Sequence, residues 1–264
     1  MTSINMHAAW KAILNWPARL AVVAATAAAG PALGGPAVTP SGPAVPENLL
    51  RIELHLAQPL SAPLDVRHVA LFDGDGQPIP DAFLDLAPAD ADGLDVSLLL
   101  HPGRIKSGVG PNLALGPALR AGQMVTLRID DPQLPTPLEK RWRVEAALRQ
   151  PISPQRWRVY AVKAGSRQEL RVAFGQALES DAAALIAVQS PDGRRLKGTA
   201  RLSAGESEWR FLPSAQWRVG GYLLRMHPRL EDTQGNRLCS AFEQFKQSAQ
   251  TCSEDGRRTF TVEK

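Results

Sequence analysis

Hydrophobic and polar residues alternate with a period of two in short stretches along most of the chain. In residues 51–56 the apolar side chains are Ile52, Leu54 and Leu56, and residues 169–174 show the same alternation. This period is typical of a strand with one buried face. Polar turns separate the stretches, and no long helical period intervenes. The pattern predicts antiparallel β-structure built from many short strands.

The alternating stretches form an internal repeat, with two copies about 118 residues apart. Asp75-Gly76 and Asp192-Gly193 lie at equivalent places between apolar runs, where a hairpin needs residues that tolerate a positive φ. The matched stretches are 50–61 with 169–180, 68–79 with 185–196, 94–100 with 207–212, 120–129 with 218–226, and 141–145 with 258–263. The repeat predicts two tandem sandwiches of one design.

The second copy carries two further motifs, Gly-Gly-Tyr-Leu-Leu-Arg at 220–225 and Glu-Asp-Thr-Gln-Gly-Asn at 231–236. The first copy matches them less fully, since 122–127 lacks the tyrosine and 130–135 lacks the Gly-Asn turn. The order of elements resembles the bacterial Ig-like domain of the surface-layer-protein type. This resemblance implies an all-β fold of two tandem immunoglobulin-like antiparallel β-sandwiches in an extracytoplasmic setting. Such domains are usually spacers, adhesion parts or recognition modules.

We expect five segments along the chain. They are a signal peptide at 1–29, a disordered tether rich in proline, glycine and alanine at 30–48, a first Ig-like domain at 49–146, a linker at 147–156 and a second Ig-like domain at 157–264. The first domain differs from the second by a long loop at 101–119.

The N-terminal segment has the features of a secretory signal. Lys11 and Arg19 supply positive charge, an apolar run covers 20–29, and Ala27 to Ala29 form a small-residue cleavage site. An uncleaved anchor is the alternative, but the run is alanine-rich and short of the roughly 20 apolar residues that span a bilayer. We therefore expect an exported protein, periplasmic or at the cell surface or secreted, with no stable membrane span after signal cleavage.

The charge balance argues against a nucleic-acid partner. The chain has 30 basic and 26 acidic side chains, a net charge of +4. Removing the signal segment removes Lys11 and Arg19, which leaves 28 against 26, or +2. Arginines are scattered rather than gathered in a stripe, so the electrostatic footprint of a nucleic-acid binder is missing.

Both cysteines lie near the C-terminus, in the part that would be exported. An oxidising compartment favours a disulfide between Cys239 and Cys252. The 12-residue spacer can close, and a loop of this size contributes about 3 kcal/mol in the chain-entropy model. A zinc site is the weaker reading, because zinc needs four ligands and the nearest histidine is His227.

The loop at 101–119 is the candidate binding surface, because long loops in a compact fold are usually functional or disordered. Its candidate residues are His101, Arg104, Lys106 and Asn112; the arginine and lysine could hold an anionic group. The alternative is that its prolines shape a connection whose apolar residues Ile105, Val109, Leu113 and Leu115 cover the end of the sandwich. We expect the first domain to recognise the partner and the second domain to have a structural, stabilising role.

No reactive cluster stands out, so we expect no enzyme, no cofactor and no metal site. The Asp-Gly turns at 73–76 and 90–95 and the turn at 231–236 are explained by turn chemistry, although calcium remains open there. Trp157 and Trp217 are expected in the core, with sugar stacking as the alternative. We interpret the chain as a non-catalytic binding or structural module of the cell envelope with a protein or glycan partner. The alternative is a hydrolase or metal-dependent enzyme with a site at the domain junction or under loop 101–119.

Overall fold

A computed structural model describes residues 36–106, 108–242 and 256–264. The expected signal peptide therefore lies outside the described residues, as does the first part of the expected tether. Among the described helices, none is long and apolar enough to cross a membrane.

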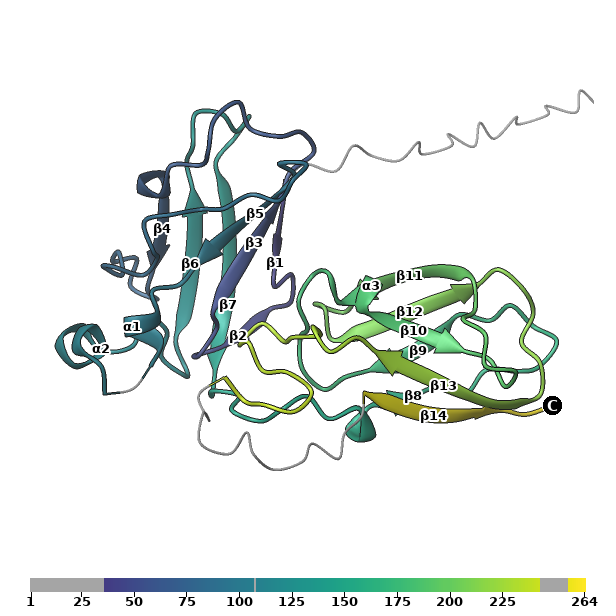
Figure 1. The fold of residues 1–264 in the computed structure, drawn as a ribbon. Coiled ribbons are helices and arrows are strands. Elements are labelled where there is room, and N and C mark those ends of the chain that lie inside the picture. Colours follow the sequence, from purple (N-terminus) through teal and green to yellow (C-terminus); the bar gives the residue numbers. More distant parts are fainter. Residues whose placement is uncertain (1–35, 107, 243–255) are drawn as a thin grey trace, which may run out of the picture. The chain divides into compact units, whose positions relative to one another are not determined.

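The first half of the described chain forms two facing sheets (Figure 1). The first sheet has the order β1-β3-β5 and the second the order β2-β7-β6-β4. Strand β2 runs parallel to β7, whereas every other pairing within these two sheets is antiparallel. The strands are β1 (Ala37–Thr39), β2 (Ala44–Pro46), β3 (Arg51–His55), β4 (Val69–Phe72), β5 (Asp95–Leu99), β6 (Met124–Ile129) and β7 (Leu138–Glu145).

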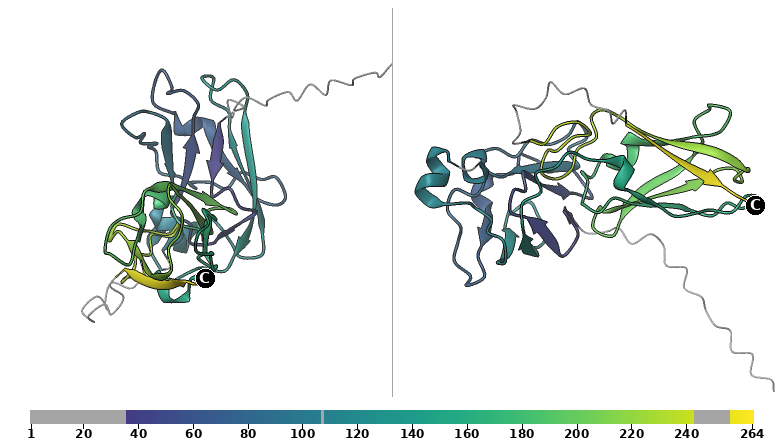
Figure 2. Two further views of the ribbon diagram at one scale, coloured as in Figure 1. Left: turned by 90° about the vertical axis from the view of Figure 1, so that its right-hand side faces the viewer. Right: turned by 90° about the horizontal axis from the view of Figure 1, so that it is seen from below.

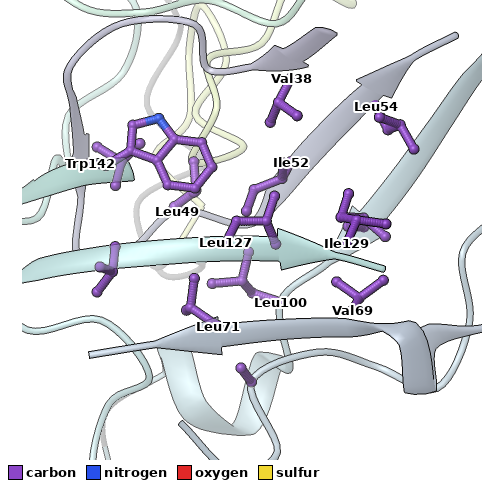
Figure 3. Close-up of a cluster of buried hydrophobic side chains, with 14 of the residues drawn as sticks. Val38, Leu49, Ile52, Leu54, Val69, Leu71, Leu100, Leu127, Ile129 and Trp142 are labelled. Carbon is purple, nitrogen blue, oxygen red and sulfur yellow. The ribbon is translucent and has the colours of Figure 1, made fainter. Parts of the chain in front are cut away.

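Alternating side chains from the two sheets of this sandwich meet in one core (Figure 3). Ile52 on β3 and Leu127 on β6 are each 1% exposed. Trp142 on β7 is equally buried, and its indole Nε1 donates a 2.9 Å hydrogen bond to the carbonyl oxygen of Pro40. The period-two alternation thus fills a single interior, as a sandwich requires.

The second half repeats this plan with a core of its own. Its sheets have the orders β11-β12-β9-β8 and β10-β13-β14. These orders match the four-plus-three arrangement of a constant-type immunoglobulin domain. The strands are β8 (Arg158–Val159), β9 (Leu170–Ala173), β10 (Ile186–Gln189), β11 (Gly198–Ser203), β12 (Glu208–Pro213), β13 (Gly220–Met226) and β14 (Arg257–Val262).

Tyr222 provides a second immunoglobulin feature in this sandwich. It lies near the start of β13, and its hydroxyl donates to the Arg218 carbonyl oxygen at 3.1 Å and accepts from the Arg218 amide nitrogen at 3.0 Å. A tyrosine that ties the start of this strand to the preceding turn is a hallmark of the fold. The chain is therefore all-β, with two successive immunoglobulin-like sandwiches.

The predicted strand stretches and turns are confirmed in both copies. The pairs β3 and β9, β4 and β10, β5 and β12, β6 and β13, and β7 and β14 lie at the positions that the repeat predicts. Gly76 has a φ of 77° and Gly193 a φ of 82°, as the Asp-Gly hairpins require. Five short helical segments complete the described chain: η1 (Val66–His68), α1 (Pro102–Ile105), α2 (Gly110–Leu115), η2 (Pro154–Arg156) and α3 (Ala182–Leu185).

The expectation of a disordered tether is wrong for its second part. Strands β1 and β2 lie within residues 30–48, where Val45 is 1% exposed. Pairing of β1 with β3 and of β2 with β7 places both strands at the edges of the two sheets. The linker at 147–156 is also more than a spacer, since Ile152 is fully buried and the Leu148 carbonyl accepts from Asn48 Nδ2 at 2.8 Å. Both results depend on partners distant in the sequence.

Candidate binding sites

Loop 101–119 folds into α1 and α2, and it stands out from the sheets of the first sandwich in Figure 1 and in the view from below in Figure 2. Arg104 anchors it. The guanidinium donates to the carbonyl oxygens of Gly116 at 2.7 Å, Pro80, and Pro117 at 3.5 Å, and the residue is 3% exposed. Burial lowers the pKa of Arg104. Arg104 therefore holds the shape of the loop, and its donors face carbonyl groups rather than solvent.

The other three predicted residues also make contacts within the chain. His101 caps α1, with its Nδ1 accepting from the Gly103 amide at 3.0 Å. Asn112 Nδ2 donates to the Arg104 carbonyl oxygen at 3.3 Å. The Lys106 ammonium lies 5.2 Å from the centre of the Phe242 ring, in cation–π range. The structure thus brings the four residues together in one loop, while their binding of a partner stays a prediction.

The apolar residues of the loop divide into two groups. Ile105 is 6% exposed and belongs to the first core. Leu113 is 75% exposed, Leu115 42% and Val109 36%. The alternative that all four cover the sandwich end is therefore wrong for these three, because Leu113 and Leu115 on α2 and Val109 just before it face the solvent. The loop presents a small aliphatic surface on a base fixed by Arg104.

A charged cluster joins residues of the first and second sandwich within the compact unit from Gly34 to Lys264. Arg51 Nη2 lies 2.7 Å from Glu231 Oε2, and Arg51 Nε lies 3.0 Å from Glu179 Oε1. Glu231 also pairs with Arg237. Beside these groups is a cavity of about 590 Å³ lined by both sandwiches. Backbone contact adds to the junction, since the Leu50 amide donates to the Thr233 carbonyl oxygen at 3.0 Å.

Two carboxyl groups at the junction have raised pKa values. Burial raises the pKa of Glu179 to about 8, with the Arg51 cation acting in the opposite direction. Burial also raises the pKa of Glu53, whose carboxylate accepts from Ser97 Oγ at 2.8 and 2.9 Å. Perturbed carboxyl groups in a cleft are features of functional sites but also of structural ion networks. Here Glu179 lies against Arg51, which also contacts Glu231, and this network gives Glu179 a structural role.

A hydroxyl, an imidazole and a carboxylate line up across the first sheet. His55 Nε2 lies 3.0 Å from Thr39 Oγ1, and His55 Nδ1 lies 2.6 Å from Asp95 Oδ1. Sequence reasoning missed this line, because strand pairing and not spacing creates it. A hydrolase also needs N–H donors beside the nucleophile. Pro40, which follows Thr39, has no N–H, and the Ser41 amide donates to Glu206 at 2.7 Å.

A metal-dependent enzyme would need a cluster of metal ligands, and the described part of the chain has none. Among residues 36–106, 108–242 and 256–264, no group of three His, Cys, Asp or Glu side chains is placed to hold a metal ion. Asp232 is fully buried and its Oδ1 accepts from the Asn236 amide at 2.8 Å, which closes the turn. Burial raises the pKa of Asp232 to about 6.

Trp157 and Trp217 are core residues, 3% and 1% exposed. The alternative of sugar stacking is therefore wrong for both rings. Cys239 belongs to the described chain, but Cys252 lies outside the described residues. The disulfide between them stays a prediction.

No family model matches the sequence, and no curated protein does. The BSP domain of a biofilm associated protein is 12% identical over 72% of this chain, with a TM-score of 0.26. This chain spans 26% of that protein's length. Titin domains Z1Z2 in complex with telethonin are 15% identical, covering 74% of this chain and 89% of theirs, with a TM-score of 0.21. Rst D1-D2 is 8% identical, covering 81% and 91%, with a TM-score of 0.23. Scores of this size carry no argument, so the fold assignment rests on strand order and on Tyr222.

Proposed function

We propose that this chain is a non-catalytic, exported module of the cell envelope that binds a protein partner through loop 101–119 of its first domain. In this proposal the first domain includes β1 and β2 and ends near residue 146, the second covers 157–264, and a signal peptide at 1–29 is removed. Resemblance to surface-layer-type Ig-like domains supports the extracytoplasmic setting.

The observation that carries the proposal is the 75% exposure of Leu113 on a loop whose base is buried. An exposed aliphatic group on a fixed loop costs little entropy when it is covered by a partner. Between the two partner classes, a protein is favoured over a glycan. Sugars stack on aromatic faces, and residues 101–119 contain no phenylalanine, tyrosine or tryptophan.

The test compares three forms of the mature protein in a pull-down from envelope extract, followed by measurement of the affinity for the purified captured protein. The loop variant carries Leu113→Ser and Leu115→Ser. The control carries Leu86→Ser, since Leu86 is 49% exposed on the same sandwich. We expect about a tenfold or greater loss of affinity for the loop variant alone, as for removal of an interface centre.

Equal affinity of the loop variant and the wild type for every captured protein would exclude the loop as the binding surface. Capture of an envelope polysaccharide instead of a protein would overturn the protein assignment. The variant Arg104→Ala is unsuitable for this test, because the buried guanidinium holds the loop together.

A further inference from the structure

The second sandwich has a cavity of about 490 Å³. The connections that line it lie at the end of the sandwich that carries the C-terminus (Figure 1). Two connections line it, residues 190–197 between β10 and β11 and residues 214–219 between β12 and β13. The volume lies within the range of about 300 to 1,000 Å³ that ligand sites occupy.

The charges around this cavity are unbalanced. Four cationic side chains line it against the single carboxylate of Asp192, an excess of three positive charges. Arg194 lies 3.8 Å from Asp192. The other three cations, Arg195, Lys197 and Arg218, form no ion pair or side-chain hydrogen bond with any residue that the structure describes. A concave site lined by charge of one sign attracts an oppositely charged ligand.

Beside Ser190, Ser214 and Gln216, the uncharged part of the lining is apolar. It includes Val219, 55% exposed, and Tyr222, whose hydroxyl is engaged by the Arg218 backbone. Pro191, Leu196 and Ala215 add further apolar surface. A suitable ligand therefore combines an apolar group with negative charges around it.

We propose that this cavity binds an acidic peptide segment of a partner protein, with one apolar side chain in the cavity and carboxylates at the basic rim that Arg195, Lys197 and Arg218 form. Arginine suits this task because its guanidinium forms paired hydrogen bonds with a carboxylate. A polyanionic glycan has no aliphatic side chain to cover Val219, and a membrane surface is flat whereas the site is concave. The Tyr222 hydroxyl holds the Arg218 backbone in place, which lowers the ordering cost of binding.

This site is separate from loop 101–119, so its test is independent of the function proposed above. The probe is a fluorescein-labelled heptapeptide with one central leucine between acidic residues, and the measurement is fluorescence anisotropy with the mature protein. We expect saturable binding that weakens as salt is added. A peptide with serine in place of the central leucine is expected to bind more weakly than the leucine peptide.

The variant Arg195→Ala with Arg218→Ala is expected to weaken binding about tenfold or more, on the scale of lost charge-assisted contacts. The matched control is Arg128→Ala with Arg143→Ala, which also removes two exposed arginines. Thermal unfolding of both variants checks that they are folded. If the first variant does not fold, Lys197→Ala and Val219→Ser are tested in its place.

Three outcomes would overturn the proposal. Equal weakening by the control pair would show a general charge effect. Equal affinity for the leucine and serine peptides, or equal competition by an acidic polysaccharide, would show that the surface binds anions without preference for a peptide. Binding to vesicles of anionic lipid without binding to the peptide would assign the surface to membranes.

Discussion

Arg51 of the first sandwich contacts Glu231 of the second at 2.7 Å and, through its Nε, Glu179 at 3.0 Å. The Nε–Oε1 contact with Glu179 is close but is not an aligned hydrogen bond. The two sandwiches are thus joined by the charged side chain of Arg51, whose neighbour Glu179 is buried. This arrangement makes the junction sensitive to pH.

Glu179 makes stability fall as pH rises. Its pKa is about 8 in the folded protein, against 4.5 ordinarily, so the folded state holds the proton more tightly. The stabilisation is complete below pH 4.5 and is lost as pH rises through 8. We expect Glu179→Gln to gain stability over the wild type at pH 9 and to differ from it least near pH 5, measured by urea unfolding at both values.

Glu208→Gln is the control of opposite sign. The Arg171 guanidinium holds the pKa of Glu208 at about 2, so its stabilisation is present above pH 4.5 and is lost as pH falls through 2. This variant should be less stable than the wild type at pH 7.

The outcome that would contradict the Glu179 prediction is an equal dependence of stability on pH in Glu179→Gln and in the wild type. Glu179 would then be ionised in the folded protein at neutral pH.

Removing the Arg104 guanidinium should loosen loop 101–119. Arg104→Ala leaves the carbonyls of Pro80, Gly116 and Pro117 without their donor, and hydrogen bonds to charged groups are worth about 1.5 to 3 kcal/mol. We expect a loss of that order in the free energy of unfolding and faster proteolysis within the loop. Unchanged cleavage, compared with the exposed control Arg128→Ala, would show that the guanidinium does not hold the loop.

Tyr222→Phe should destabilise the second sandwich by about 1 to 2 kcal/mol, because the Arg218 carbonyl and amide both lose a partner. Tyr160→Phe is the control, since the Tyr160 ring contacts Arg158 and Arg171 through its face. Denaturant unfolding followed by tryptophan fluorescence measures both variants. Equal losses would place the effect in general packing instead of the hydroxyl.

The exported protein should contain a disulfide between Cys239 and Cys252 and begin after residue 29. Mass spectrometry of non-reduced tryptic peptides, together with N-terminal sequencing of the protein from the envelope fraction, measures both features. We expect one linked pair of peptides and a reduction-dependent drop in stability of about 3 kcal/mol. Two free thiols in the mature protein would contradict the bridge, and an intact Met1 would contradict cleavage.

The period of the strands and the places of the hairpins follow from the amino-acid sequence alone. Ile52 and Leu170 lie in strands that their own alternation predicts, and Gly76 and Gly193 lie in turns that only a few residue types can form. These features are local, because side-chain alternation and backbone φ depend on a few neighbouring residues.

The roles of residues whose partners are distant in the sequence become visible only in the folded chain. Val45 reads as part of a proline-rich tether until β2 pairs with β7, about 100 positions away. From the sequence, Arg104 is interpreted as a cation able to bind an anionic group. In the folded loop its guanidinium instead donates to backbone carbonyl oxygens. The basic rim around Arg218 likewise forms only where two connections meet. Pairing and burial join groups far apart in the sequence, so no local pattern records them.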